Sequence, residues 1–219
     1  QKVKFMISAL AAIFATSFLI ALSGALMPGP LLSAAVNESS KRGFWAGPLL
    51  TSGHALLELA LVVALLLGLA PILRLTAVFV FCALGGSLIL LMMAWGMIRS
   101  IPTLSLRREA TPGRINHPVV SGILMSMANP YWFIWWATIG LGYILYSQQF
   151  GFWGVACFFA GHISADLVWY SLVSAAIAGG RRFLTDRLYR GLIGILAAFL
   201  VGLAVYFAYA GIVKLRLLF

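Results

Sequence analysis

Two histidine–carboxylate pairs are the residues in this sequence whose types and spacing could do chemistry. His54 precedes Glu58 by four residues, and His162 precedes Asp166 by the same interval. In a helix, residues four apart lie on the same face, so each pair would present an imidazole and a carboxylate together. Such groups can bind a cationic substrate, relay protons near neutral pH or coordinate a divalent metal.

The two pairs belong to a duplicated stretch. Residues 43–58 read GFWAGPLLTSGHALLE, and residues 151–166 read GFWGVACFFAGHISAD. The copies keep a constant offset of 108 residues (162 − 54 and 166 − 58). One buried polar pair can be an accident of packing, whereas two copies indicate a single site that both halves of the chain approach. The alternative is that two structural His–carboxylate hydrogen bonds hold the repeats together.

Composition places these pairs in a membrane. Of the 219 residues, 63% are hydrophobic and 9% are charged, against about 25% charged in soluble domains. The apolar runs reach the length of about 20 residues that a membrane-spanning helix needs. The net charge of +10 does not indicate a nucleic-acid partner, because the basic residues lie in short loops between apolar runs, where membrane topology places them.

We predict an all-α integral membrane protein with six transmembrane helices in a single domain, residues 1–219. The expected helices cover residues 5–36, 43–70, 72–98, 119–146, 151–178 and 192–213. The first apolar run is longer than the roughly 7–15 residues of a signal-peptide core, so we expect it to be retained as a spanning helix. The loop 101–117 separates a first repeat, 5–100, from a second repeat, 118–217.

The helix count predicts that the two repeats are inverted. Three is an odd number, so the second repeat enters the membrane from the opposite side, as in many secondary transporters. The loops after the first, third and fifth helices carry most of the lysines and arginines. Because the positive side faces the cytoplasm, we expect both termini on the outer side. His54 and His162 lie 11 residues into their helices, which at 1.5 Å per residue is about the middle of a ~30 Å hydrocarbon core.

Two helix-breaking motifs interrupt the expected spans. Pro28-Gly29-Pro30 lies late in the first helix, and Asn129-Pro130 lies in the corresponding helix of the second repeat. Proline removes a backbone hydrogen bond inside a helix, and in lipid the freed groups must be satisfied by protein or a cavity. Such breaks can bind a charged or zwitterionic ligand. The alternative is a kink that serves packing.

The remaining features have simpler interpretations. An aromatic run follows the second break. It could wall a ligand cavity, but we expect it in an interfacial belt or on the lipid-facing surface; its members are Tyr131, Trp132, Phe133, Trp135 and Trp136. The two cysteines, Cys82 and Cys157, form no CxxC motif and are expected to pack as small hydrophobes. No Ser–His–Asp set or phosphate-binding loop is recognised, so we expect neither an enzyme nor a cofactor.

The two breaks, the six expected helices and the arginine that ends the third helix before a basic loop resemble the LysE/RhtB amino-acid exporter family. The resemblance extends over residues 14–214. It implies a secondary active exporter in the bacterial inner (cytoplasmic) membrane, driven by the proton gradient or the membrane potential. The implied substrates are amino acids such as lysine, arginine, threonine or homoserine. The wider superfamily is also similar to exporters of cadmium and other divalent metals.

The sequence departs from the family at the expected site. Many members carry an acidic residue directly after the glycine of the second helix, where this chain has His54, and a lysine or small residue after Asn-Pro, where it has Tyr131. We therefore expect a substrate-binding or proton-coupling site, formed by His54, Glu58, His162, Asp166, Pro28, Gly29, Pro30, Asn129 and Pro130. Two alternatives stay open: a divalent metal exporter that uses the four ionisable residues as ligands, and a membrane structural subunit without a substrate. Substrate identity is open, as is assembly into a homodimer.

Overall fold

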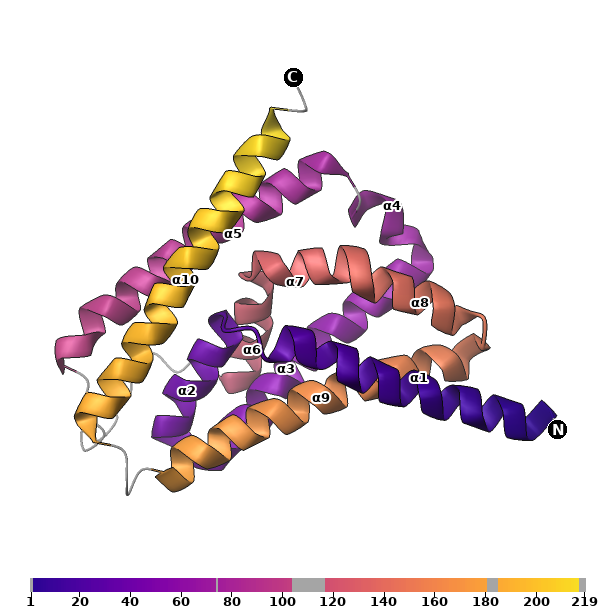
Figure 1. Cartoon of the computed structure of the whole chain (residues 1–219), viewed down its shortest axis with the longest axis horizontal. Helices are drawn as coiled ribbons and strands as arrows, with labels where there is room; N and C mark the ends of the chain where they lie inside the picture. The colour runs from indigo at the N-terminus through magenta and orange to yellow at the C-terminus, as the bar shows by residue number, and fades with distance from the viewer. Residues whose placement is uncertain (1, 74, 104–116, 181–184, 217–219) are drawn as a thin grey trace.

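The computed structural model of the chain describes residues 2–73, 75–103, 117–180 and 185–216, and every regular element in these ranges is a helix. The first half contains α1 (Lys2–Ala25), α2 (Pro30–Arg42), the 3-10 helix η1 (Gly43–Trp45), α3 (Ala46–Ala64), the π-helix η2 (Leu65–Leu69), α4 (Ala70–Leu73), α5 (Thr76–Ser100) and the 3-10 helix η3 (Ile101–Thr103). The second half contains α6 (Pro118–Met127), α7 (Pro130–Trp135), the π-helix η4 (Trp136–Gly140), α8 (Leu141–Gln148), α9 (Gly151–Gly180) and α10 (Asp186–Leu215) (Figure 1).

Five helical stretches in the described residues are long and apolar enough to cross a membrane: Val3–Ala25, Pro30–Ile72, Thr76–Ser100, Gly151–Gly180 and Asp186–Leu215. They confirm the prediction of an all-α, multi-pass membrane protein. The fourth predicted helix, 119–146, is interrupted at Asn129-Pro130 as expected, between α6 and α7, and differs from expectation only in the π-helix η4 that precedes α8. The arrangement of the predicted helices as six membrane spans in two inverted repeats stays a prediction. Residues 104–116 of the predicted basic loop lie outside the described residues.

Both predicted breaks separate consecutive helices. Residues 26–29 lie between α1 and α2, and residues 128–129 lie between α6 and α7. In each case a proline takes the first position of the next helix, where its fixed φ fits and its missing N–H is not needed. The Asn129 side chain caps α7 by accepting a hydrogen bond from Tyr131 N at 3.1 Å, whereas no side chain caps α2.

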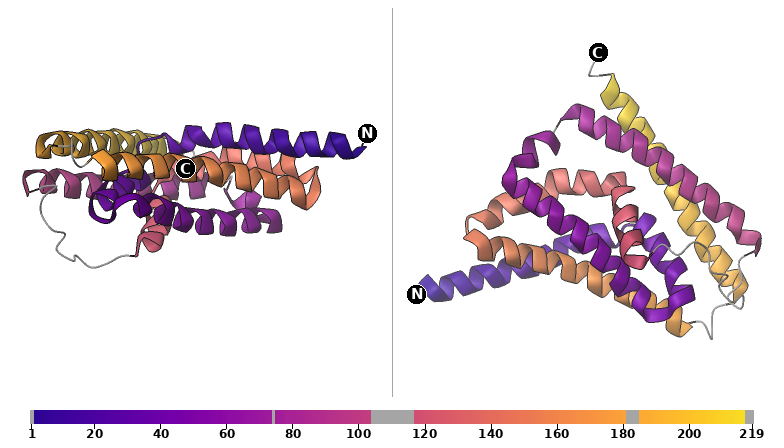
Figure 2. Two further views of the ribbon diagram at one scale, coloured as in Figure 1. Left: turned by 90° about the horizontal axis from the view of Figure 1, so that it is seen from below. Right: turned by 180° about the vertical axis from the view of Figure 1, so that it is seen from behind.

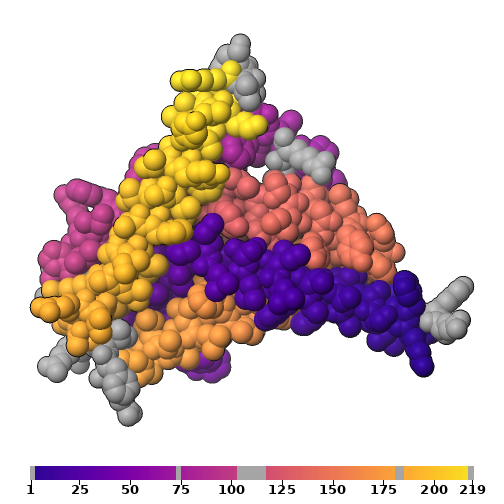
Figure 3. Space-filling model, viewed as in Figure 1, coloured from indigo at the N-terminus to yellow at the C-terminus, as the bar shows by residue number. Residues whose placement is uncertain are grey.

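Helices from the two halves pack in corresponding pairs. α1 packs along α9 and α3 packs along α6, while α3 also contacts α9 and α5 packs along α10. The first and fourth predicted helices contain α1 and α6, and the second and fifth contain α3 and α9. If the first three predicted helices correspond to the last three, the contact of α1 with α9 is therefore equivalent to the contact of α6 with α3. Figures 1 and 2 show a flattened body in which α5 and α10 lie side by side and run in opposite directions. In Figure 3, α1 and α10 form ridges on the face toward the viewer.

The helices α5 and α10 share one burial pattern. Their buried positions include Ala83, Gly86, Ser87, Leu90 and Ala94 in α5, and Ile193, Leu196, Ala197, Leu200 and Ala204 in α10. The intervals between successive members are the same in both sets. The other faces of these helices expose large apolar side chains, which is typical of helices that meet lipid.

Candidate functional site

Glycines immediately before the two site histidines bring their helices into close contact with neighbours. Gly53 of α3 lies against the carbonyl oxygen of Val119 in α6, and Gly161 of α9 lies against the carbonyl oxygen of Phe14 in α1. A Cβ atom at either glycine would overlap that oxygen. These two equivalent contacts fix how far α3 and α9 stand from α6 and α1, and so position the histidines that follow.

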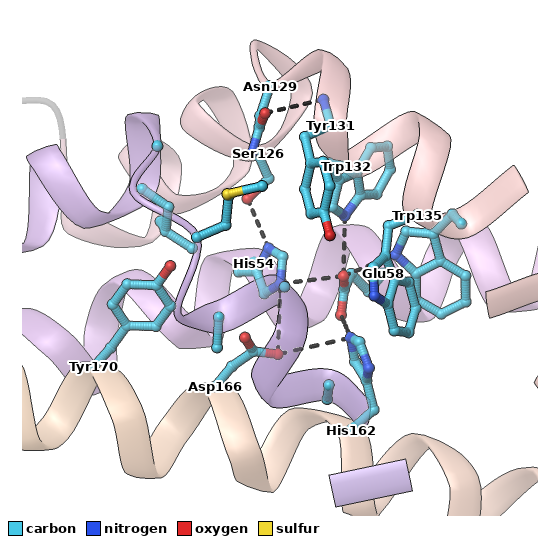
Figure 4. A pocket seen from close by; sticks show the side chains of 17 residues that line it. His54, Glu58, Ser126, Asn129, Tyr131, Trp132, Trp135, His162, Asp166 and Tyr170 are labelled. Atoms are coloured by element: carbon cyan, nitrogen blue, oxygen red, sulfur yellow. Dashed lines mark hydrogen bonds and ion pairs between the residues drawn. The ribbon is translucent and has the colours of Figure 1, made fainter. Parts of the chain in front are cut away.

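The four ionisable side chains converge between α3 and α9 (Figure 4). His54 Nε2 lies 3.1 Å from Glu58 Oε1 and 3.7 Å from Asp166 Oδ2. His162 Nε2 lies 2.9 Å from Glu58 Oε2 and 3.6 Å from Asp166 Oδ2. All four residues are buried, and Glu58 is only 1% exposed. Each imidazole therefore contacts both carboxylates, although the residues come from sequence segments 108 positions apart (162 − 54).

Two tryptophans hold the carboxylate of Glu58. Trp132 Nε1 donates to Glu58 Oε1 at 2.9 Å, and Trp136 Nε1 donates to the same oxygen at 2.8 Å. The expected interfacial belt is wrong for Trp132, Trp135 and Trp136, which are 8%, 5% and 0% exposed. An indole can be buried when its N–H finds an acceptor, and the charged carboxylate in the interior provides that acceptor.

The two imidazoles differ at their second ring nitrogen. His54 Nδ1 lies 2.7 Å from Ser126 Oγ, and the Ser126 hydroxyl donates to the carbonyl oxygen of Gly122 at 2.7 Å. Because that bond uses the hydroxyl hydrogen, Ser126 Oγ accepts the hydrogen of His54 Nδ1. His162 Nδ1 has no hydrogen-bond partner in the described part of the chain, and its ring packs against Trp135 with centroids 4.7 Å apart. At the Nδ1 edge, a hydrogen bond thus orients His54, whereas ring packing against Trp135 holds His162.

The cluster lines a narrow pocket that reaches both helix breaks. Met27 and Gly29 of the first break line it, as does Asn129 of the second, and Tyr170 of α9 closes one side. The cavity volume is about 50 Å³, and a single water needs about 10–15 Å³ of such space. The pocket as it stands has room for a few water molecules.

The structure separates the predicted site residues into two groups. The four ionisable residues, Gly29 and Asn129 line the same pocket. Pro28, Pro30 and Pro130 are not among the described residues that line it. Pro130 instead packs against Gly86 of α5. The prolines therefore shape the breaks, while their neighbours present polar groups to the cavity.

Similarity to known proteins indicates the family to which the chain with this pocket belongs. The family model described as "LysE type translocator" matches residues 22–211, which include both breaks and all four ionisable residues. The chain belongs to this family. It is also similar to a protein of Bacillus subtilis (strain 168) named "Putative amino acid efflux protein YcgF", with 24% identity over 206 residues that cover 93% of this chain and 98% of the relative. No solved structure matches the chain.

Membership of the LysE-type translocators confirms the resemblance seen in the sequence. This LysE-type protein is a membrane transporter and not an enzyme. The candidate site includes Ser126 and Tyr170, which sequence reasoning missed, and Trp132 and Trp136, for which it favoured an interfacial or lipid-facing position over a cavity wall. The four-residue spacing of Trp132 and Trp136 could have indicated that both belong to the candidate site. It matches the spacing of the two histidine–carboxylate pairs and places both indoles on one helix face.

Proposed function

We propose that this LysE-type translocator exports amino acids or close derivatives across the cytoplasmic membrane as a secondary active transporter, driven by the proton gradient or the membrane potential. The observation that carries the proposal is the meeting of two carboxylates, two imidazoles and two helix breaks in one buried pocket. Ionisable groups inside a membrane domain are expensive to keep and mark substrate or ion pathways. The name of the Bacillus subtilis relative supports the same substrate class.

The pocket offers complementary partners to both ends of an amino acid. Its carboxylates, Glu58 and Asp166, suit an ammonium group. The start of α2 reaches the pocket through Gly29 and Leu31, and its N-cap residue, Gly29, has no side chain with which to cap it. The first N–H groups of a helix lack intrahelical partners and attract anions. A substrate carboxylate can therefore bind at the start of α2 while its ammonium group faces Glu58.

Transport requires this pocket to widen. A cavity of about 50 Å³ holds only a few waters, so an amino acid enters only when the surrounding helices separate. The interrupted helices provide hinge points for such a movement, because α1 ends before α2 begins and α6 ends before α7 begins. Inverted repeats commonly move against each other around a central site, and we propose that the two halves of this chain do so.

The proposed orientation follows from the charge distribution of the loops. We propose six spans in two inverted repeats with both termini on the outer side of a bacterial inner membrane. Cysteine labelling of single-cysteine variants near Lys4 and Lys214 tests this orientation. Assembly as a homodimer remains a prediction, which mass measurement of the detergent-solubilised protein can check.

Uptake into inverted membrane vesicles tests the proposed function. A panel of labelled amino acids is offered to vesicles with an imposed proton gradient, and the native chain is compared with Glu58→Gln and Asp166→Asn. We expect at least one amino acid to accumulate, and both variants to reduce its initial rate at least tenfold. Glu38→Gln is the matched control, because Glu38 pairs with Lys41 and Arg42 outside the pocket. Accumulation that is equal in all four proteins contradicts the site, and no accumulation of any amino acid contradicts the substrate class.

A further inference from the structure

We propose that His54, Glu58, His162 and Asp166 form a binding site for a divalent transition-metal ion of the zinc type, coordinated by two imidazole nitrogens and two carboxylate oxygens. The proposal goes beyond amino-acid export, because ion binding does not depend on which solute the protein carries. It depends on the geometry, charge and hydrogen bonding of the four side chains.

The distances match a small tetrahedral site. Zinc binds histidine nitrogen and carboxylate oxygen at about 2.0–2.2 Å, so neighbouring ligand atoms of a tetrahedron lie roughly 3.3–3.6 Å apart. The four imidazole–carboxylate distances are 2.9, 3.1, 3.6 and 3.7 Å. All four candidate ligand atoms lie within 4.8 Å of one another. Small side-chain rotations therefore suffice to place all four around one ion.

The charge of the cluster matches a divalent cation. Glu58 and Asp166 bring two carboxylates into an interior where buried charges need partners or a metal. A dication with two carboxylates and two neutral imidazoles is electrically neutral as a unit. The cavity volume of about 50 Å³ accommodates an ion without separation of the helices, which entry of an amino acid requires.

Hydrogen bonding around His54 directs a lone pair at the centre of the cluster. Ser126 accepts the hydrogen of Nδ1, so the neutral ring carries its lone pair on Nε2, which faces carboxylate oxygens of Glu58 and Asp166. Metal-binding histidines commonly donate their other ring N–H to an acceptor in this way. The lone pair of His54 Nε2 thus points at the same place as oxygens of both carboxylates, where a cation would contact all three groups.

The buried atoms without hydrogen-bond partners point to the same place. In the described part of the chain, Asp166 Oδ2 and Glu58 Oε2 accept no hydrogen bond, and His162 Nε2 makes none. His162 Nε2 lies 2.9 Å from Glu58 Oε2 without the alignment of a hydrogen bond. Buried polar atoms are rarely left unpaired in proteins. A common metal ion would occupy the point that these atoms surround.

The ligand types select the ion. Imidazole with carboxylate suits zinc, cobalt and similar divalent ions, whereas magnesium prefers six oxygen ligands and retains its waters. We therefore expect one zinc ion per chain with an affinity far above that for magnesium. The two cysteines do not take part, because the cluster contains only histidine and carboxylate residues.

Zinc titration of the full-length protein tests the proposal. The protein is purified in detergent without a polyhistidine tag, stripped with a chelator and titrated with zinc. We expect one ion per chain, and a loss of affinity of about 10- to 100-fold or more when a ligand is changed in His162→Gln or Asp166→Asn. His117→Gln is the matched control, since His117 is exposed at the start of α6, and it should bind zinc as the native chain does. Helical content and elution volume establish that each variant is folded.

X-ray absorption at the zinc edge provides a test that needs no variant. We expect a first coordination sphere of four nitrogen and oxygen atoms, about two of them from imidazole. Absence of stoichiometric binding, a sphere of water oxygens only, or affinity that survives Asp166→Asn combined with Glu58→Gln overturns the proposal. Amino-acid uptake is measured separately, so zinc binding without uptake contradicts the proposed export alone, and uptake without zinc binding contradicts this inference alone.

Discussion

The side-chain amide of Asn129 lies against Gly29, so the break in the first predicted helix touches the break in the fourth. Asn129 Nδ2 is 3.4 Å from the position that a Cβ atom would take on Gly29. Both residues also line the pocket. A change in the backbone at one break therefore reaches the other by direct contact, next to the ionisable cluster.

Replacement of Asn129 by alanine should reduce both stability and transport. The change removes the cap of α7, which costs about 1 kcal/mol of unfolding free energy, and also removes the contact with Gly29. Thr185→Ala is the control, because Thr185 caps α10 by accepting a hydrogen bond from Leu188 N at 3.2 Å. Thermal unfolding should change similarly in the two variants, while vesicle uptake should fall only in Asn129→Ala. Equal uptake in both would show that the break matters only for folding.

Replacement of Trp136 by phenylalanine should weaken the site. It keeps an aromatic ring but removes a hydrogen bond to a charged oxygen of Glu58, and such bonds contribute about 1.5–3 kcal/mol. We expect a lower unfolding temperature and a lower rate of uptake. Trp153→Phe serves for comparison, because Trp153 is 67% exposed and should tolerate the change. A Trp136 variant that matches Trp153→Phe in both measurements would contradict the role given to the indole.

Replacement of Gly53 by alanine should destabilise the protein. The added Cβ meets the carbonyl oxygen of Val119, and the helices α3 and α6 must move apart. Overpacking of this kind costs about 1–3 kcal/mol. Gly85→Ala is the matched change within a helix, since nothing lies within 4 Å of its Cβ position, and it should be neutral or slightly stabilising. Unfolding in detergent distinguishes the two, and equal stability would contradict the close contact.

Replacement of Ser126 by alanine should lower the affinity for zinc by about tenfold or more, because His54 Nδ1 loses its acceptor. Ser126→Thr retains a hydroxyl and should recover part of the affinity. Ser164→Ala is the control, since the Ser164 hydroxyl donates to the carbonyl oxygen of Ala160 in its own helix. Zinc titration measures all three, and unchanged affinity in Ser126→Ala would exclude Ser126 as the residue that orients His54.

Replacement of Ala21 by serine should supply the partner that His162 Nδ1 lacks. Ala21 follows Phe14 by seven residues, as Ser126 follows Val119, and the two carbonyl groups make equivalent contacts with Gly161 and Gly53. A new hydrogen bond to a buried ring nitrogen is worth about 0.5–1.5 kcal/mol, so the unfolding temperature should rise. Ala11→Ser, at an exposed position of α1, should not raise it. A drop in stability for Ala21→Ser would contradict the equivalence of the two positions.

The paired repeats made the centre of the site predictable from sequence. A histidine followed four residues later by a carboxylate occurs twice in strongly apolar surroundings, and this repetition identified His54, Glu58, His162 and Asp166. Helix positions followed from long apolar runs, and Pro28-Gly29-Pro30 and Asn129-Pro130 located both interruptions. These features depend on local sequence, and the structure places them near where they were expected.

The residues that support the cluster were not predictable in the same way. Trp132 and Trp136 looked like interfacial aromatics, because nothing in their own segment shows that Glu58 lies beside them. Ser126 resembles any small residue of a membrane helix until His54 is placed next to it. Such contacts join positions more than 70 residues apart, and no local pattern encodes them.

The equal division of the ionisable cluster between the two halves of the chain has a consequence for the release of substrate. Each half supplies one imidazole and one carboxylate, so neither half retains more than two of the four contacts once they part. If the halves separate during transport, as proposed, a substrate that is bound tightly while they touch is bound weakly once they part. Opening would then itself release the substrate, without a separate releasing element.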